Sequence, residues 1–321
     1  MRKLAILDDY QRVALSTADW SAIRQHAEIH VFDRPFADEH AAAAALRDFE
    51  MICLLRERMP VPASLIAALP NLKFICITGA HNRTLDIAAA RARGIVVSHT
   101  GNGASEFPTA ELAWALILAA ARYIPQEDRA LRAGTWQTTI GTTLHGKTLG
   151  LVGLGRIGRQ VAAIGRAFGM SVVAWSPHLT AERAEAGGAM LVGKNELFAS
   201  SDVVSLHLVL GETTRGIVGA AEFARMRPGA LLVNTARGPL IDEAALLAAL
   251  RERRIRAALD VYDREPLPRD HPLLALDNVV LAPHLGFVVD DVYSVFFNDA
   301  VENVAAYLAG QPIRLMSAAS R

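Results

Sequence analysis

The sequence predicts an α/β protein built from two doubly wound parallel-sheet domains. Short runs rich in β-branched residues alternate with alanine-rich stretches through nearly all of the 321 residues. This alternation is typical of parallel strands joined by helices. A chain of this length is too long for one comfortable hydrophobic core, so two domains are expected.

The first series of strands occupies roughly the first hundred residues. Helices between these strands are predicted at Ser16–Ala27 and Ala63–Leu69. A longer helix is predicted to open near Pro108, a favourable first-turn residue, and to end at Arg122. The predicted strands are Leu4–Leu7, Ile29–Phe32, Met51–Leu55, Phe74–Thr78 and Ile95–Ser98.

A second series follows, and the two are joined near residues 100–110. A final helix, Asp290–Leu308, comes after the second sheet is complete. The predicted strands of this series are Thr148–Val152, Ser171–Trp175, Val203–Leu208, Ala230–Asn234, Ile255–Leu259 and Val279–Leu281.

Charge balance narrows the classes of partner. Lys plus Arg and Asp plus Glu each total 33, so the formal net charge is zero. Such a chain carries no electrostatic signature of nucleic-acid binding and no polybasic membrane patch. We therefore expect a small molecule or another protein as its partner, with no nucleic acid and no membrane.

Cysteine usage and hydropathy point to the cytoplasm. Cys53 and Cys76 both lie in apolar runs that resemble buried strands, so two reduced core thiols are favoured over a disulfide. The first residues lack the apolar stretch of a signal peptide. The longest apolar run, Leu112–Ala121, is too short to span a bilayer. We expect a cytoplasmic protein and assign no metal ligand.

A glycine-rich loop follows the strand Thr148–Val152. The run Gly153-Leu154-Gly155-Arg156-Ile157-Gly158 fits the pattern G-x-G-x-x-G, and an alanine-rich helix follows it. In this context the first glycine permits a tight turn and the second lets backbone N–H groups approach a pyrophosphate. The third allows the helix to pack closely on the strand. The loop predicts a dinucleotide site that includes Arg156 and Ile157, and a chance glycine cluster is the less favoured interpretation.

The residue that would contact the adenosine ribose is Ser176, at the end of the next strand. A site specific for NAD usually has Asp or Glu here, about 20 residues after the glycines. A hydroxyl can bond to a ribose but does not repel a 2′-phosphate, and the nearest arginine that follows is Arg183. The sequence therefore leaves the choice between NAD and NADP open.

Three polar residues follow three later strands. Arg237, Glu265 and His284 come after the strands that end at Asn234, Leu259 and Leu281. The carboxyl ends of parallel strands meet at one edge, so these side chains should converge near the bound dinucleotide. Each residue taken singly has a structural alternative, a solvated charge or a packed histidine, but their joint placement favours a site. We also assign to the dinucleotide site His207, Thr235, Ala236, Asp260 and Gly286.

The chain resembles the D-isomer-specific 2-hydroxyacid dehydrogenases, a family that includes phosphoglycerate dehydrogenase and glyoxylate/hydroxypyruvate reductase. The resemblance extends over essentially the whole chain and rests on four segments: Gly153–Gly158, Asn234–Gly238, Leu259–Tyr262 with Glu265-Pro266, and Pro283-His284. It implies that Arg237, Glu265 and His284 are the catalytic residues. It also implies a Rossmann domain at residues 104–289, inserted into a flavodoxin-like substrate domain at 1–103 plus 290–321.

The implied reaction is hydride transfer between NAD or NADP and a small D-2-hydroxy acid. His284 would exchange the hydroxyl proton, Glu265 would orient its ring, and Arg237 would bind the substrate carboxylate. Asp260 would contact the nicotinamide carboxamide.

Substrate contacts are expected in the other domain. By resemblance, the turn Gly79-Ala80-His81-Asn82 would bind the substrate carboxylate through its backbone N–H groups, although it is equally an ordinary β-to-α turn. Arg56, Arg58 and Arg83 are candidates for a substrate phosphate, and surface arginines are at least as favoured. Phosphoglycerate, glyoxylate, hydroxypyruvate and other short 2-oxo acids remain equally open.

Two rival functions share the architecture. Formate dehydrogenases resemble a variant with an amide where Glu265 stands, so the ionisable group argues against that activity. A dinucleotide-sensing protein similar to transcriptional corepressors is the main alternative, although no basic or low-complexity segment suggests it. The resemblance also implies a homodimer, for which Trp114 and Trp136 offer apolar surface unless they pack internally.

Overall fold

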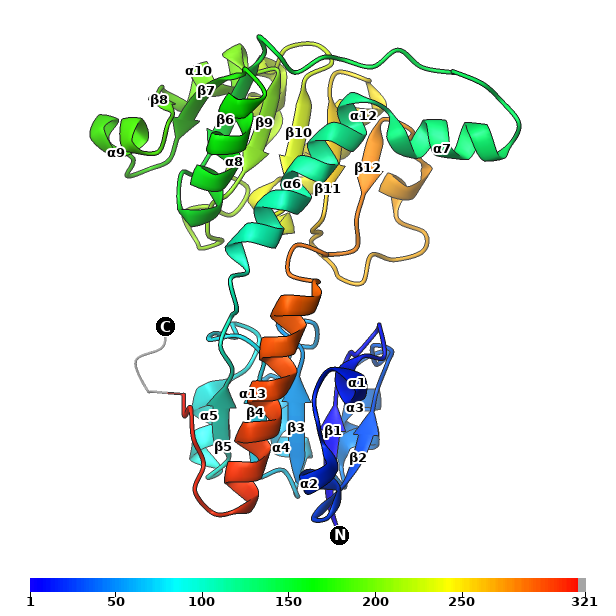
Figure 1. Cartoon of the computed structure of the whole chain (residues 1–321), viewed down its shortest axis with the longest axis vertical. Coiled ribbons are helices and arrows are strands. Elements are labelled where there is room, and N and C mark those ends of the chain that lie inside the picture. The colour runs from blue at the N-terminus through cyan, green and yellow to red at the C-terminus, as the bar shows by residue number, and fades with distance from the viewer. Residues whose placement is uncertain (317–321) are drawn as a thin grey trace. The chain divides into compact units, whose positions relative to one another are not determined.

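In the computed structural model, which describes residues 1–316, the chain folds as two compact units (Figure 1). The first unit holds Met1–Ala104 and the described residues from Val289 onward, and the second is Ser105–Val288. The sequence predicts a first domain at 1–103 plus 290–321 and a second at 104–289. Residues 317–321 of the predicted first domain lie outside the described part of the chain.

The first unit is built on a five-stranded sheet in which every strand pairs in parallel. The strand order β2-β1-β3-β4-β5 is that of a flavodoxin-like sheet, which confirms the predicted fold class. The strands are β1 (Arg2–Ile6), β2 (Ala27–Val31), β3 (Met51–Leu54), β4 (Phe74–Ile77) and β5 (Val96–His99).

Helices cover both faces of this sheet. On one face α3 (Glu39–Leu46), α4 (Ala63–Ala68) and α5 (Ile87–Ala92) contribute to one apolar core with the strands. On the other face lies α13 (Asp290–Leu308), whose Tyr307 ring stacks on Phe74 with ring centroids 4.5 Å apart. The last helix of the chain therefore completes the first unit.

The predicted helix Ser16–Ala27 is wrong. The structure has two single-turn helices there, α1 (Ala14–Thr17) and α2 (Ser21–Arg24), and Ala27 already belongs to β2. Ala18 is extended, and the carboxylate of Asp19 accepts a hydrogen bond from the N–H of Ser21 at 2.9 Å. A side chain that satisfies a backbone N–H in this way competes with continuation of a helix.

The second unit contains a seven-stranded parallel sheet with the order β12-β11-β10-β9-β6-β7-β8. This is the Rossmann order with one added edge strand, which also confirms the prediction. The added strand is β12, at the edge opposite β8. The sequence did not predict β8 (Met190–Leu191), because a strand of two residues is too short to show a periodicity. The others are β6 (Thr148–Val152), β7 (Ser171–Trp175), β9 (Val203–Leu206), β10 (Leu231–Asn234), β11 (Arg256–Leu259) and β12 (Val279–Leu281).

Two apolar cores lie on opposite faces of this sheet. One is formed with α6 (Glu106–Ala121), α8 (Arg156–Ala167) and α9 (Ala181–Ala186). The other is formed with α10 (Lys194–Ser200), α11 (Ala220–Arg225) and α12 (Glu243–Arg251). Short 3-10 turns occur at Gly238–Leu240 and Pro272–Ala275.

The segment after α6 is far more exposed to solvent than the rest of the unit. Helix α7 (Ile124–Arg132) buries none of its residues, and every residue from 131 to 143 is exposed. Figure 1 shows α7 and the chain that follows it extending away from the sheet of the second unit. The carboxylate of Glu127 holds this segment by accepting hydrogen bonds from the backbone N–H and hydroxyl of Thr138 at 3.1 and 2.8 Å. We call α7 and residues 133–143 the arm.

The two tryptophans singled out in the sequence have different surroundings. Trp114 is buried, its indole donates to the carbonyl of Val161 at 3.2 Å, and its ring stacks on Phe168. Trp136, on the arm, is 74% exposed. Only Trp136 therefore offers its ring to a partner.

Cys53 and Cys76 are buried free thiols on adjacent strands, as predicted. Among residues 1–316, no helix combines the length and the apolar character needed to cross a bilayer.

A buried acid in the first unit makes its stability depend on pH. Asp8 follows β1, is 3% exposed and has a left-handed backbone with φ of 58°. Burial raises its pKa from 3.8 to about 6, although the nearby charge of Arg58 and the hydroxyl of Tyr10 act in the opposite direction. The folded state therefore retains this proton to higher pH than the unfolded chain does. The associated stability is present below about pH 4 and is lost as the pH rises through about 6.

We predict that Asp8→Asn raises the free energy of unfolding of the first unit at pH 8, by up to about 3 kcal/mol, and changes it little near pH 4. Asparagine is neutral and tolerates a left-handed backbone. Chemical denaturation at the two pH values, with the exposed residue change Asp48→Asn as a control, measures the effect. An equal change at both pH values would contradict the assignment.

Candidate active site

The residues predicted for the site follow six strands that are consecutive neighbours in the second sheet. All strands of this sheet are parallel, so the segments that follow them emerge at one edge. From β12 to β7, these segments carry His284, then Asp260 and Glu265, then Arg237, His207, Gly153 and Ser176.

A histidine and a glutamate form the centre of this edge. His284 Nδ1 lies 2.5 Å from Glu265 Oε2, and Glu265 Oε1 accepts the backbone N–H of Tyr262 at 2.9 Å. The two side chains are 30% and 32% exposed. Because Glu265 engages Nδ1, the other ring nitrogen, Nε2, is the one that can exchange a proton with a ligand.

The backbone of His284 is held in an unusual conformation. Its φ is 56°, and its N–H donates to the carbonyl of Asp260 at 2.8 Å. A left-handed conformation is uncommon for a residue with a Cβ and persists only when its surroundings enforce it.

Asp260 provides that enforcement. Its side chain is fully buried and accepts the N–H groups of Leu285 and Gly286 at 2.6 and 3.0 Å. Burial raises the pKa of Asp260 to about 6, and these two N–H groups and the nearby His284 counteract the rise. Each carboxylate oxygen can accept a second hydrogen bond, so the contact of Asp260 with a carboxamide stays a prediction. Asp260 positions the loop that carries the histidine.

Arg237 lies in a loop shaped by Asn234. Asn234 Oδ1 accepts the N–H of Ala236 at 3.0 Å, and its Nδ2 donates to the carbonyl of Arg237 at 2.8 Å. Arg237 Nη1 donates to the carbonyl of Ala236 at 2.7 Å. Gly238 is needed because a Cβ there would lie 2.1 Å from the carbonyl carbon of Tyr262, which follows β11. This close approach brings the Arg237 loop against the segment that leads to Glu265.

The glycine loop has the geometry of a phosphate cradle. Gly153 has φ of 104°, and a Cβ there would lie 2.7 Å from the carbonyl oxygen of His207. A Cβ at Gly158 would lie 2.4 Å from the carbonyl oxygen of Gly153, whereas one at Gly155 would meet nothing within 4 Å. Space is therefore open only at the second glycine, where α8 begins and its first N–H groups face outward. A pyrophosphate fits this arrangement.

Neutral polar groups flank the cradle. Thr235 Oγ1 is buried and has no hydrogen-bond partner among residues 1–316, which is unusual for a buried hydroxyl. Burial lowers the pKa of His207 to about 4, so its ring is neutral at pH 7, and its Nε2 lies 2.9 Å from Ser205 Oγ. An unsatisfied hydroxyl at the strand edge is consistent with a ligand that has hydrogen-bonding groups.

Substrate residues predicted for the first unit also come together, but their donors are already engaged. The N–H of Gly79 donates to Thr100 Oγ1 at 2.7 Å, and that of Ala80 donates to Asn102 Oδ1 at 3.0 Å. Arg56 Nη1 lies 3.4 Å from the same Asn102 oxygen. Thr100 and Asn102 were missed in the sequence, because no motif indicates which distant side chain will accept a given backbone N–H.

The other candidate arginines have contacts within the fold. Arg58 donates to the carbonyl of Asp8 at 2.7 Å and to the hydroxyl of Tyr293 at 3.0 Å, and its guanidinium lies over the Tyr10 ring. These contacts give Arg58 a structural role. Arg83 bonds through its backbone N–H to Glu57 Oε1 at 3.0 Å. The bond of Arg83 uses only its backbone, so Arg56 and Arg83 both stay candidates for a substrate contact.

We predict that Gly158→Ala weakens dinucleotide binding at least about tenfold, because the new methyl group would push α8 away from the glycine loop. Gly193→Ala is a matched control, since a Cβ at that helix N-cap meets nothing within 4 Å. Fluorescence titration with NADH and NADPH gives the dissociation constants, and thermal melting verifies that both variants fold. Unchanged affinity in a folded Gly158→Ala protein would contradict this role.

Comparison with known proteins agrees with this geometry. The NAD binding domain of the D-isomer specific 2-hydroxyacid dehydrogenases matches residues 114–286. The chain is 42% identical over 264 residues to D-3-phosphoglycerate dehydrogenase of Archaeoglobus fulgidus, covering 81% of this chain and 50% of that protein. It is 36% identical over 301 residues to glyoxylate reductase of Aeropyrum pernix, covering 90% and 89%.

A solved structure is similar over nearly the full length. Phosphoglycerate oxidoreductase from Vibrio cholerae O395 superposes with a TM-score of 0.90 at 39% identity, covering 97% of this chain and all of that one. The chain spans about half the length of the curated phosphoglycerate dehydrogenases that it matches. The matched domain and the similarity to full-length relatives identify the chain as a member of the D-isomer specific 2-hydroxyacid dehydrogenase family.

Proposed function

We propose that the protein transfers a hydride between a nicotinamide dinucleotide and a short D-2-hydroxy acid or 2-oxo acid. The observation that carries this proposal is the pair His284–Glu265, 2.5 Å apart at the strand edge that also bears the glycine loop. An imidazole held by a carboxylate is suited to proton exchange with a hydroxyl or carbonyl oxygen.

The catalytic residues are Arg237, Glu265 and His284. A bound nicotinamide dinucleotide would supply the hydride. In reduction, protonated His284 donates a proton from Nε2 to the carbonyl oxygen. Glu265 stabilises the charged imidazole through Nδ1, and in oxidation the neutral ring accepts the hydroxyl proton. Arg237 binds the carboxylate, work suited to its planar fork of donors.

The cofactor is held by the glycine loop and the residues that flank it. The open space at Gly155 and the first turn of α8 would hold the pyrophosphate, and Gly153 and Gly158 would keep the loop close to the helix. His207, Thr235 and Ala236 would offer polar groups to the same cofactor. Ser176 follows β7 at the position where NAD-specific sites carry a carboxylate, and its neutral hydroxyl does not repel a 2′-phosphate. We propose that the protein accepts NADP as well as NAD.

The substrate is a small molecule with a carboxylate beside the reacting carbon. The turn at Gly79 and Ala80, with Arg56, forms the carboxylate subsite of the first unit. Relatives named for phosphoglycerate and for glyoxylate both support this class. A panel of glyoxylate, hydroxypyruvate, pyruvate and phosphohydroxypyruvate, each with NADH and NADPH, tests it. Tight dinucleotide binding without turnover of any 2-oxo acid would favour a dinucleotide-sensing protein instead.

We predict that His284→Asn lowers turnover by about 10² to 10⁴ and leaves dinucleotide affinity unchanged, because the amide cannot exchange the proton. Arg237→Lys should also be severe, since an ammonium cannot reproduce the fork of donors. Steady-state kinetics and cofactor titration measure both effects, and Arg251→Lys, an exposed change at the end of α12, is the control. Near-normal turnover in the His284 variant would remove it from the mechanism.

We also propose a homodimer formed through the arm. Trp136 is 74% exposed, Ile140 94% and Leu131 57%, an unusual concentration of apolar side chains on one projecting segment. Large aromatic side chains of this kind are enriched in interfaces between proteins.

We predict that the double change Trp136→Ser and Ile140→Ser converts a dimer into a monomer, because it removes the apolar anchors of the arm. Light scattering after gel filtration gives the mass of each species. Met190→Ser, which changes an exposed apolar residue elsewhere in the same unit, is the control. A wild-type monomer, or a dimer that survives the double change, would contradict the proposal.

A further inference from the structure

One side-chain oxygen joins the two groups that form the proposed carboxylate subsite. Asn102 Oδ1 accepts the N–H of Ala80 at 3.0 Å and lies 3.4 Å from Arg56 Nη1. A backbone N–H and a guanidinium that converge on one oxygen are the donors that a substrate carboxylate would use. In the structure, the neutral amide oxygen of Asn102 lies where an oxygen of the carboxylate would accept from these two donors.

The space for this contact depends on Gly79. A Cβ at Gly79 would lie 1.7 Å from Arg56 Nη1 and 2.9 Å from Asn102 Oδ1, and φ of Gly79 is 86°. The backbone of Arg56 is fixed as well, because its N–H donates to Thr78 Oγ1 at 2.8 Å. The guanidinium and the amide oxygen therefore meet directly against the substrate turn.

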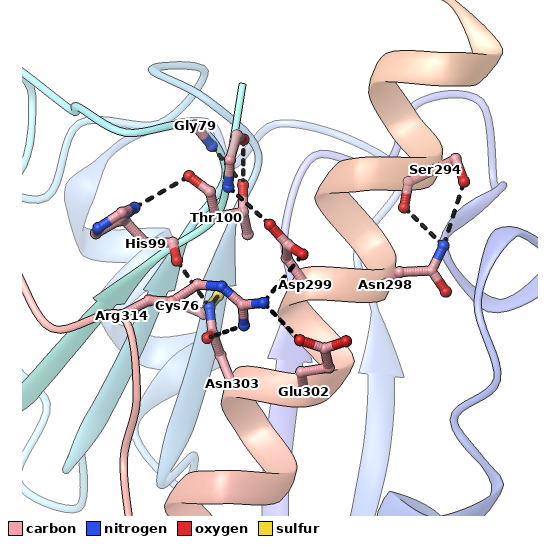
Figure 2. A network of polar contacts seen from close by, with 11 residues as sticks. Cys76, Gly79, His99, Thr100, Ser294, Asn298, Asp299, Glu302, Asn303 and Arg314 are labelled. Carbon is pink, nitrogen blue, oxygen red and sulfur yellow. Dashed lines mark hydrogen bonds and ion pairs between the residues drawn. The ribbon is translucent and has the colours of Figure 1, made fainter. Parts of the chain in front are cut away.

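The backbone that presents Asn102 is held from α13 (Figure 2). Gly101 donates its N–H to Asp299 Oδ2 at 2.7 Å, and Asn303 Nδ2 donates to the carbonyl of His99 at 2.9 Å. Arg314 contacts both of these residues of α13: it forms an ion pair with Asp299 Oδ1 at 3.3 Å and donates to Asn303 Oδ1 at 3.0 Å. We call Asp299, Asn303 and Arg314 the frame.

The same frame also reaches the turn itself. Thr100 Oγ1 accepts the N–H of Gly79 and donates to the carbonyl of Gly101 at 2.9 Å (Figure 2). Because the main chain on the N-terminal side of Asn102 is fixed in this way, a change at Asn102 alters its side chain without releasing the turn.

We propose that Asn102 Oδ1 occupies the position of one oxygen of the substrate carboxylate, and that substrate must displace it to bind. Asn102 is then a specificity-determining residue, and this inference rests on the proposed function. A charge-assisted hydrogen bond is roughly twice as strong as a neutral one, so a carboxylate displaces the amide whereas an uncharged ester or amide of the substrate does not. The site therefore selects anionic 2-oxo acids.

Two substitutions at this position give effects of opposite sign. Asn102→Asp places a fixed carboxylate on Arg56, so the KM for the 2-oxo acid should rise at least about tenfold. Asn102→Ala removes the competing oxygen, so KM should fall about threefold. In both variants kcat and the dissociation constant of the dinucleotide should stay within about twofold of wild type, because the second unit is unchanged. Asn298→Asp adds the same charge to an exposed position on α13 and is the matched control.

Oxalate binding to the cofactor-saturated protein, measured by isothermal titration calorimetry, provides a readout that needs no turnover. Its affinity should rise in Asn102→Ala and fall in Asn102→Asp, and thermal melting verifies folding. If Asn102 only stabilises the turn, the alanine variant should bind substrate and oxalate more weakly than wild type. That result would overturn the inference. Oxalate affinities that do not differ among wild type and variants, or no oxalate binding at all, overturn it as well. If wild type binds oxalate but reduces no 2-oxo acid, the proposed function fails, and the direction of the oxalate effects still decides the role of Asn102.

Discussion

The candidate site depends on one buried carboxylate. Asp260 has no exposed surface, and its two oxygens bind consecutive backbone N–H groups while its own carbonyl accepts the N–H of His284. These three bonds enforce the left-handed backbone of His284 and direct its ring to Glu265. Burying a carboxylate is unfavourable unless hydrogen bonds compensate. The pKa of Asp260 is raised because its hydrogen bonds compensate for only part of the effect of burial. The imidazole is therefore held in place before any ligand binds.

The first unit uses buried polar groups in a comparable way. Hydrogen bonds among Asp299, Asn303 and Arg314 fix the main chain at the end of β5 and just after it. The hydroxyl of Thr100, in that segment, accepts the N–H of Gly79 and so fixes the turn after β4 as well. Satisfied polar networks of this kind make a loop rigid. In both units, a rigid scaffold behind the strand edge supports loops whose exposed atoms are suited to chemistry.

The two edges also differ. In the second unit, the space at Gly155 is open, and the hydroxyl of Thr235 has no hydrogen-bond partner within the described part of the chain. In the first unit the donors of Gly79 and Ala80 are bonded to side chains of the protein. Under the proposed function, a dinucleotide enters a preformed cradle, whereas a carboxylate has to replace an internal acceptor. Substrate affinity would then include a competition that cofactor affinity lacks.

The sequence by itself determined the two-sheet fold class, the glycine loop and the order of the predicted site residues along the second sheet. These features follow from local periodicity, glycine spacing and the rule that parallel strands share a carboxyl edge. It did not determine the break between α1 and α2, the strand β8, the burial of Asp260 or the part played by Asn102. The break depends on a local hydrogen bond from Ser21 to Asp19, and β8 is too short to show a pattern. The burial of Asp260 and the position of Asn102 are decided by which distant group satisfies a particular backbone N–H. Such choices depend on tertiary packing because the partners are far apart in the chain: Ala80 and Asn102 by 22 residues, Asp260 and Leu285 by 25.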